Sequence, residues 1–200
     1  MFEMPKEEDQ GMLAFSNLCL RHRRIRCDRI EAVFFHHPDD AYLVIEDQDS
    51  VFDVVSNMPI SSLGISVYEP KQIELLGELS GKLAFQYPYS VVDRRFENIS
   101  MKIGDRYARS ILLQGILGSK TLKVNAPRKA RQIHKLFHAA METSVYDPIQ
   151  FTLGFLKKSS ACDYCLIGIE NVNQLCNVTD AWKDLNAQEF DYSVVEETVL

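Results

Sequence analysis

Short apolar runs that each close on polar residues follow one another along this chain, and this series constrains the fold more than any other feature. The runs cover residues 30–40, 62–68, 82–90, 107–115 and 162–171. Segments with the apolar spacing of helices, such as IELLGEL and HKLFHAAM, separate them. Strands that are apolar on both faces are typical of parallel sheets covered by helices. The sequence therefore predicts an α/β protein with five parallel strands and functional residues at their carboxyl ends.

The length of the chain limits how many strand–helix units it can hold. Its 200 residues, 46% of them hydrophobic, are enough for one sizeable core. A closed eight-unit barrel typically needs about 250 residues, or roughly 30 for each unit. On that measure five or six units and a tail fit into this chain, so a barrel built from it would be an incomplete TIM-type (β/α)8 barrel.

The composition along the chain divides it into three parts. We expect a loose acidic N-terminus over residues 1–11, the partial barrel over 12–182 and a C-terminal tail over 183–200. Helices are predicted at about 12–24, 50–57, 71–79, 130–143 and 147–158, and from about residue 172 onward.

The charge and hydropathy of the sequence disfavour several classes of protein. The net charge is −6 and acidic residues gather at both ends, whereas a nucleic-acid surface normally needs a basic stripe. The sequence contains no apolar stretch near the ~20 residues of a membrane span, and its first residues lack the pattern of a secretion signal. We therefore expect a cytoplasmic protein that binds neither nucleic acid nor membrane.

Two sequence features each allow a chemical and a structural interpretation. Cys162 and Cys165 form a C-x-x-C pair, which is the spacing of a redox dithiol or of half a zinc site. The pair falls on a predicted strand, where residues three apart point to opposite faces, and this favours simple packing. The basic stretch 119–131 could contact a phosphate, although such runs are usually solvated.

The densest polar cluster at any predicted strand end comprises His36, His37, Asp39 and Asp40. Histidine and carboxylate side chains are common metal ligands. Adjacent strand residues alternate between faces, however, and Pro-Asp-Asp is ordinary turn sequence, so no metal site is predicted. A single inward histidine, His36, is the more economical candidate for a hydrogen-bond or proton partner of a substrate.

Polar residues at other strand ends suggest how a ligand could be held. Gln86, at the end of the third run, can both donate to and accept from an amide, and the Ser66 hydroxyl lies where it could assist. Gly168 precedes a helix that begins near residue 172, and backbone N–H groups at a helix start can bind phosphate. Gln86 and Ser66 could instead be satisfied polar residues at the rim of the sheet, and position alone favours this for Ser66. Phosphate binding at a helix start is general to such folds and is not specific to Gly168.

Taken in order, five segments of the sequence resemble the aldo/keto reductase family, whose members are barrel enzymes that use a nicotinamide cofactor. The segments are DRIEAVFFHHPDD, LGISVY, FQYPYSVVDRR, RSILLQG and LIGIENVNQL. Each is modest alone, but their order and spacing extend over nearly the whole chain. The resemblance implies strands 4–8 of the barrel with their helices, NADP or NAD as cofactor, and a small carbonyl compound as substrate.

The resemblance also implies one catalytic residue. The family has a tetrad of Asp, Tyr, Lys and His, and His36 matches the histidine at the end of the fourth barrel strand. The other three residues come from barrel elements that would precede residue 1. We therefore expect a chain truncated at its N-terminus, with negligible reductase turnover by itself and with open strand edges that allow self-association. The alternative is a non-catalytic remnant that binds a nucleotide or a partner.

Most residues that match the family correspond to positions that contact the cofactor in its members. Ser66 and Gln86 match residues that hold the nicotinamide carboxamide, and Tyr87 matches an aromatic ring that stacks on the nicotinamide. The segment that wraps the pyrophosphate and a residue near the adenosine also have counterparts in this chain. These counterparts are Ser110, Leu112 and Gly115 for the pyrophosphate, and Gln174 for the adenosine.

Three positions depart from the family pattern. Val67 stands where many members have Asn, and Val178 replaces a frequent Asn near the adenine. Glu170 occupies a position that is often basic in members that bind the 2′-phosphate of NADP, and a carboxylate there would repel that phosphate. The sequence therefore leaves the choice between NADP and NAD open.

Overall fold

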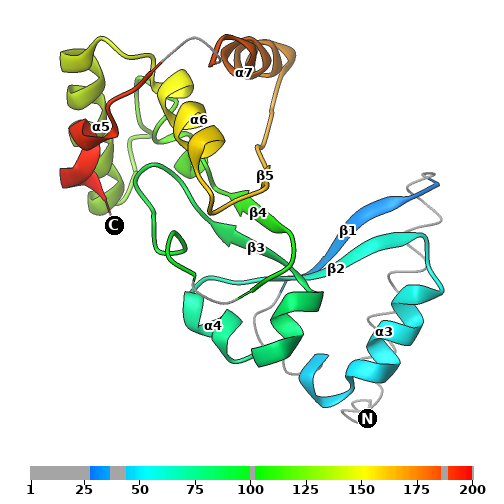
Figure 1. Ribbon diagram of the computed structural model, residues 1–200. Coiled ribbons are helices and arrows are strands. Elements are labelled where there is room, and N and C mark those ends of the chain that lie inside the picture. The colour runs from blue at the N-terminus through cyan, green and yellow to red at the C-terminus, as the bar shows by residue number, and fades with distance from the viewer. Residues whose placement is uncertain (1–27, 37–43, 100–101, 186–188, 200) are drawn as a thin grey trace, which may run out of the picture.

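A computed structural model of the chain describes residues 28–36, 44–99, 102–185 and 189–199. Five strands form one sheet in the order β1-β2-β3-β4-β5, and every neighbouring pair is parallel (Figure 1). The strands are β1 (Ile30–Phe35), β2 (Ile60–Ser66), β3 (Ala84–Pro88), β4 (Arg106–Arg109) and β5 (Tyr164–Cys165). The predicted α/β fold with a parallel five-stranded sheet is therefore confirmed. The N-terminus expected to be loose and the helix expected at about 12–24 lie outside the described residues.

Most predicted helices are present with bounds close to the expected ones. They are α3 (Gln48–Ser56), α4 (Pro70–Glu74), α5 (Arg128–Ser144), α6 (Pro148–Lys158) and α7 (Val172–Asp184), with 3-10 turns η1 (Gly77–Lys82), η2 (Leu113–Gly115) and η4 (Tyr192–Thr198). α6 begins where the sequence predicts because the Asp147 carboxylate accepts hydrogen bonds from the backbone N–H groups of Ile149 and Gln150, at 3.0 and 2.9 Å. No helix in the described part of the chain is both long and apolar enough to cross a membrane.

Two predicted elements are shorter than expected. The helix expected at 71–79 ends after Glu74, and the chain continues as a 3-10 turn from Gly77, whose φ of +53° an α-helix cannot contain. The last strand, expected over much of 162–171, pairs with β4 only through Tyr164 and Cys165. Residues 166–170 then run to α7 without regular structure.

The sheet curves, and one of its faces is concave. Phe34 of β1 and Tyr107 of β4 lie on the same face and meet in a T-shaped contact with ring centroids 5.1 Å apart, although β2 and β3 lie between them. The Phe34 ring passes directly over Gly64, its register partner on β2. A Cβ at Gly64 would lie 2.6 Å from the Phe34 ring and 2.7 Å from the carbonyl oxygen of Ala84. The absence of a side chain there lets β1 fold over β2.

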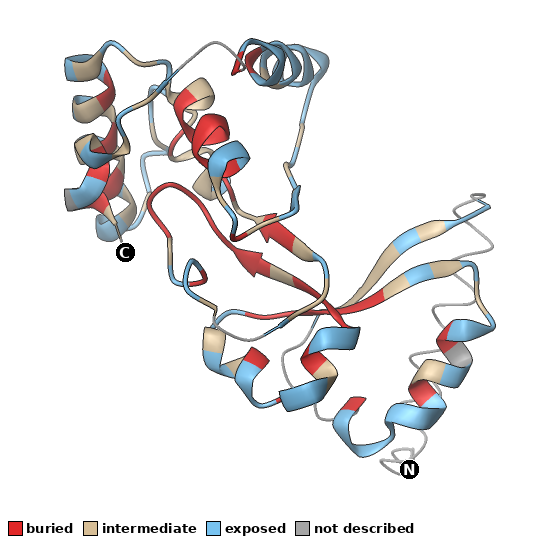
Figure 2. Ribbon diagram, viewed as in Figure 1, coloured by how far each residue is buried: buried red, intermediate tan, exposed pale blue. Residues whose placement is uncertain are grey.

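The opposite, convex face of the sheet carries the main core. On β2 from Leu63 onward and on β3, the residues of this face are almost fully buried, and the burial follows these strands through the middle of the molecule (Figure 2). Phe155 of α6 packs on Tyr89 just after β3, with ring centroids 5.6 Å apart. The largest of these buried residues on β2 and β3 are Leu63, Ile65, Phe85 and Tyr87.

The segment expected to be a C-terminal tail packs against the helices. The rings of Phe190 and Tyr192 contact Phe151 of α6, with centroids 5.6 and 5.0 Å apart. Val195 in η4 is fully buried, and η4 contacts α5. Residues 189–199 therefore form part of the helical layer on this side of the molecule (Figure 1).

Candidate cofactor-binding site

Ser66 and Gln86, which the sequence analysis singled out together, are neighbours at the carboxyl ends of β2 and β3. They are register partners, and the Ser66 hydroxyl donates to the Gln86 side-chain oxygen at 3.3 Å. Ser66 is fully buried and Gln86 is partly exposed. Within the part of the chain that the structure describes, the Gln86 amide nitrogen has no hydrogen-bond partner. This amide can therefore donate to a ligand on the concave face.

His36 lies at the same level of the sheet as this pair. It directly follows β1, and the register pair Phe35–Ile65 places the next residues, His36 and Ser66, beside each other. His36 is exposed. His37, Asp39 and Asp40 lie outside the described residues. Among the described residues there is no group of three or more His, Cys, Asp or Glu side chains placed to hold a metal ion.

Tyr107 continues the same row of side chains, and the sequence analysis missed it. It is the register partner of Gln86 on β4, and its ring stacks on Tyr164 of β5 with centroids 4.6 Å apart. Its hydroxyl is buried without a hydrogen-bond partner among the described residues. Burial, together with the negative charge of Asp105, raises the pKa of Tyr107. A buried neutral phenol beside Gln86 is a further donor that a polar ligand could satisfy.

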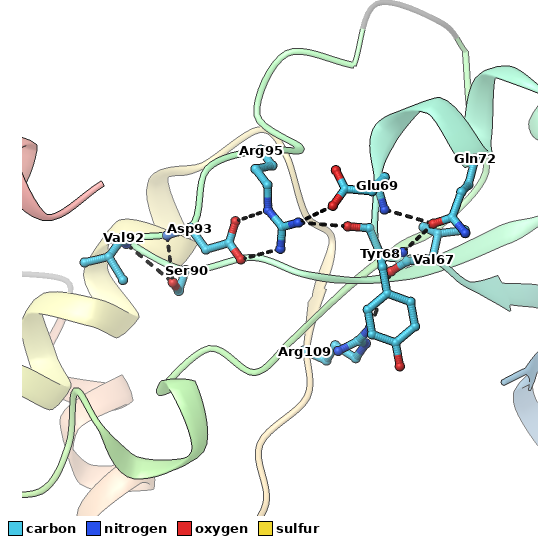
Figure 3. A network of polar contacts seen from close by, with 9 residues as sticks. All are labelled: Val67, Tyr68, Glu69, Gln72, Ser90, Val92, Asp93, Arg95 and Arg109. Atoms are coloured by element: carbon cyan, nitrogen blue, oxygen red, sulfur yellow. Dashed lines mark hydrogen bonds and ion pairs between the residues drawn. The ribbon is translucent and has the colours of Figure 1, made fainter. Parts of the chain in front are cut away.

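Arg109, the last residue of β4, brings positive charge to these strand ends. Its guanidinium lies over the Tyr68 ring, 4.4 Å from the centroid, and Nη2 donates to the carbonyl of Val67 at 3.4 Å (Figure 3). Its Nε–H is buried and has no partner in the described part of the chain. The only signal for Arg109 in the sequence was its position at the end of a strand, which alone does not distinguish it from a surface arginine.

A second arginine, Arg95, fixes the loops that follow β2 and β3 (Figure 3). It donates two hydrogen bonds of 2.9 Å to the buried carboxylate of Asp93 and one of 2.7 Å to Glu69. It also donates to the backbone carbonyl of Tyr68 at 3.1 Å. The bonds to Asp93, more than any other contact, raise the pKa of Arg95. Because Arg95 holds both loops, Tyr68 is kept in place beneath Arg109.

The structure does not bring Tyr87 together with the Gln86 side chain. Consecutive strand residues point to opposite faces, so Tyr87 lies on the convex side. There its ring stacks on Phe96 at 4.4 Å with an interplanar angle of 7°, and its hydroxyl donates to the Ala161 carbonyl. It is fully buried, and this burial raises its pKa.

Ser110, Leu112 and Gly115 lie in a tight turn directly after Arg109. Four residues of this turn have positive φ: Ser110 (56°), Leu113 (45°), Gln114 (54°) and Gly115 (90°). The turn is closed by hydrogen bonds from Leu113 to the Ser110 carbonyl and from Gly115 to the Leu112 carbonyl, at 2.8 and 2.9 Å. Positive φ is costly for residues other than glycine and is concentrated at ligand sites, where such turns can present backbone N–H groups to anions.

Gly168 and Gln174 lie further along the chain, beside the start of α7. Gln174 closes the first turn of that helix: its side-chain oxygen accepts from the backbone N–H of Glu170 at 2.8 Å, and its own N–H donates to the Asn171 side chain at 3.0 Å. Gly168 is exposed, and a Cβ there would meet nothing within 4 Å. α7 packs on α6, beyond the extended connection from β5 (Figure 1). The structure thus brings Ser66, Gln86 and His36 to one level of the sheet and places Gly168 and Gln174 apart from them.

Comparison with known proteins shows which fold this arrangement belongs to. No protein-family model and no curated protein sequence matches the chain. Solved structures do match. The aldo-keto reductase AKR11C1 from Bacillus halodurans, in its holo form, has a TM-score of 0.70 and 16% identity over 93% of this chain. The fold is that of the aldo-keto reductases.

Two further structures agree with this result. The apo form of AKR11C1 has a TM-score of 0.72 with 17% identity over 92% of this chain. The glycerol dehydrogenase AKR11B4 from Gluconobacter oxydans has a TM-score of 0.62 with 18% identity over 88% of this chain. The chain spans 66%, 67% and 59% of the holo AKR11C1, apo AKR11C1 and AKR11B4 structures respectively. It therefore has the architecture of part of an aldo-keto reductase (β/α)8 barrel.

Proposed function

We propose that this chain binds a nicotinamide dinucleotide through the concave face of its sheet, with Ser66 and Gln86 holding the carboxamide. The observation that carries the proposal is the direct pairing of these two side chains at the ends of β2 and β3. A carboxamide both donates and accepts, and the complementary groups are the Ser66 hydroxyl and the Gln86 amide nitrogen, which has no partner among the described residues. The holo form of AKR11C1 shares the fold that positions this pair.

The groups next to this pair suit the rest of such a cofactor. Arg109 supplies a cation whose buried Nε–H lacks a partner in the described part of the chain, and the turn that follows it has the backbone form of an anion-binding site. We therefore assign the pyrophosphate to Arg109 and the turn 110–115. Glu170, exposed at the start of α7, disfavours a 2′-phosphate, so we expect NADH to bind more tightly than NADPH.

The reaction class we propose is the reduction of a small carbonyl compound. The bound cofactor would supply hydride, and His36 would donate a hydrogen bond to the carbonyl oxygen. A general acid for the forming alkoxide typically contributes 10²–10⁴-fold to the rate. The family's Asp, Tyr and Lys have no assigned counterparts in these 200 residues. We therefore expect the chain to bind cofactor with negligible turnover by itself, as a nucleotide-binding module would.

Titration with NADH, followed by the fluorescence of the reduced nicotinamide, tests the binding. The Gln86→Met variant keeps the side-chain size but loses the amide, and should weaken NADH binding about tenfold, the worth of roughly one well-made hydrogen bond. The matched control is Gln132→Met, on the exposed face of α5, which should bind as the parent chain does. Equal affinity in all three proteins, or no response at millimolar NADH, would contradict the assignment.

Turnover is measured separately with a panel of aldehydes and ketones. The chain alone should oxidise NADH no faster in the presence of these compounds than in their absence. A robust rate of carbonyl reduction that His36→Ala abolishes would show that a complete catalytic centre is present. The chain would then be an active reductase and not a nucleotide-binding module.

A further inference from the structure

Cys162 and Cys165 have no part in the site described above, yet they share one cavity. This cavity of about 610 Å³ lies between β5, α6 and α7, and both cysteine side chains line it. Its walls are mainly apolar, with Trp182 and Val178 on the α7 side. Both thiols are free and partly exposed. A small molecule that enters the cavity can therefore reach both sulfur atoms.

Both cysteine side chains line the same cavity, contrary to the sequence expectation that they point to opposite faces. The expectation assumed a continuous strand, but the chain bends at Asp163 and β5 begins only at Tyr164. The bend turns Cys162 toward the cavity that Cys165 also lines, and the Cys162 thiol donates to the Leu156 carbonyl at 3.8 Å. Arg106 stabilises the bend, because it binds both oxygens of the Asp163 carboxylate at 2.7 and 2.9 Å.

The two cysteines are chemically unequal. The neighbouring Cys165 thiol lowers the pKa of Cys162, and the nearby charge of Arg106 acts in the same direction. The neighbouring Cys162 and burial both raise the pKa of Cys165. One thiol that ionises readily beside one that stays protonated is the arrangement of an attacking and a resolving cysteine.

We propose that Cys162 and Cys165 form a reversible disulfide by exchange with a low-molecular-weight disulfide, such as oxidised glutathione, that reaches them through the cavity. The Cys162 thiolate attacks one sulfur of the small disulfide and releases one equivalent of small thiol. The Cys165 thiol then loses its proton and attacks the Cys162 sulfur, which releases the second equivalent. The protein is oxidised by two electrons, and the small disulfide is reduced to two thiols.

The experiment incubates the full chain in glutathione buffers of graded oxidised-to-reduced ratio, both in native buffer and in urea. Free thiols are then blocked by alkylation, and the cysteine pairing is mapped by mass spectrometry of peptides. We expect the Cys162–Cys165 bond to form in native buffer at a ratio at least about tenfold less oxidising than in urea, because the folded chain holds both thiols at one cavity. Formation at the same ratio in both buffers would overturn the proposal.

Two variants sharpen the test. Cys165→Ser removes the resolving thiol, so Cys162 should accumulate as a mixed disulfide with glutathione. Cys176→Ser, which changes an exposed cysteine on α7, should leave formation of the Cys162–Cys165 bond unchanged. Absence of glutathione on Cys162 in the first variant, or a parent-chain disulfide that joins Cys176 to either member of the pair, would show that the cavity does not bring these two thiols together for exchange.

Discussion

At the scale of single residues, the curvature of the sheet depends on one position without a side chain. The ring of Phe34 on β1 occupies the space above Gly64 on β2 and reaches Tyr107 on β4. A methyl group at Gly64 would contact both a ring and a backbone carbonyl at less than 3 Å. The carbonyl belongs to the neighbouring strand and cannot move without breaking its pairing.

Gly64→Ala should therefore destabilise the chain by about 1–3 kcal/mol, the usual cost of an overpacked core. The midpoint of urea unfolding, followed by circular dichroism, measures this change. Gly81→Ala is the control, because a Cβ at Gly81 would have its nearest neighbour at 3.9 Å. If the two variants unfold at the same urea concentration, the packing of the Phe34 ring does not require a glycine at position 64.

The sequence predicted which candidate residues lie together only where a position at a strand end coincided with suitable side-chain chemistry. Ser66 and Gln86 met both conditions, and the structure places them together. Tyr107 and Arg109 were missed because they belong to a four-residue strand whose inward face is set only by its register with β3. The shared cavity of Cys162 and Cys165 was missed because a bend at Asp163, accompanied by a tertiary bond from Arg106, delays the start of the strand until Tyr164.

At the scale of elements, a side chain reinforces the backbone hydrogen bonds that attach β5 to β4. β5 contributes only two residues to the sheet, and the Asp163 carboxylate supplements them with three bonds to Arg106, including one of 2.9 Å from its backbone N–H. The longer helices α5, α6 and α7 were predictable because their apolar spacing and end caps are local signals. The length of β5 was not, because it depends on this contact with residue 106, which is distant in sequence.

The bond between Arg106 and Asp163 makes stability depend on pH. The Arg106 hydrogen bond, more than any other contact, lowers the pKa of Asp163 from its ordinary value of 3.8. A carboxyl group whose pKa is lower in the folded than in the unfolded state stabilises the fold fully above 3.8, and this contribution is lost as the pH falls through the lower folded value. Both side chains are partly exposed, so solvent screening limits the ion pair to about 1 kcal/mol.

Asp163→Asn should therefore lower the free energy of unfolding at pH 7, and the difference from the parent chain should vanish in strongly acidic buffer. Urea unfolding at a series of pH values gives both quantities. Asp180→Asn is a suitable comparison, since Asp180 forms a surface pair with Lys183 at 3.5 Å. A deficit in Asp163→Asn that stays constant across the pH series would assign the effect to packing instead of charge.

At the scale of the whole molecule, β1 is an edge strand of the sheet that the described residues form. β1 pairs with β2 along one edge, and no strand among the described residues pairs with its other edge. The order of the strands followed from the alternation of apolar runs and helices along the sequence. The curvature did not, because it arises from side chains on β1, β2 and β4 that meet only in the folded chain.

An unpaired strand edge of this kind favours association between copies of the chain. We expect the apparent mass in sedimentation velocity to rise with protein concentration. Ala32→Lys places a charge on the edge strand and should shift this rise to a concentration at least several-fold higher, whereas Gln132→Lys on α5 should not. A monomer at every concentration, or equal association in both variants, would exclude β1 as the contact.

The cavity beside β5 also contains the single indole of this protein, Trp182, with the Lys157 ammonium 5.0 Å from the ring centroid. Thiolates and disulfides both quench excited indoles at short range, but to different extents. The fluorescence of Trp182 would therefore report the redox state of Cys162 and Cys165 in real time, without any attached dye.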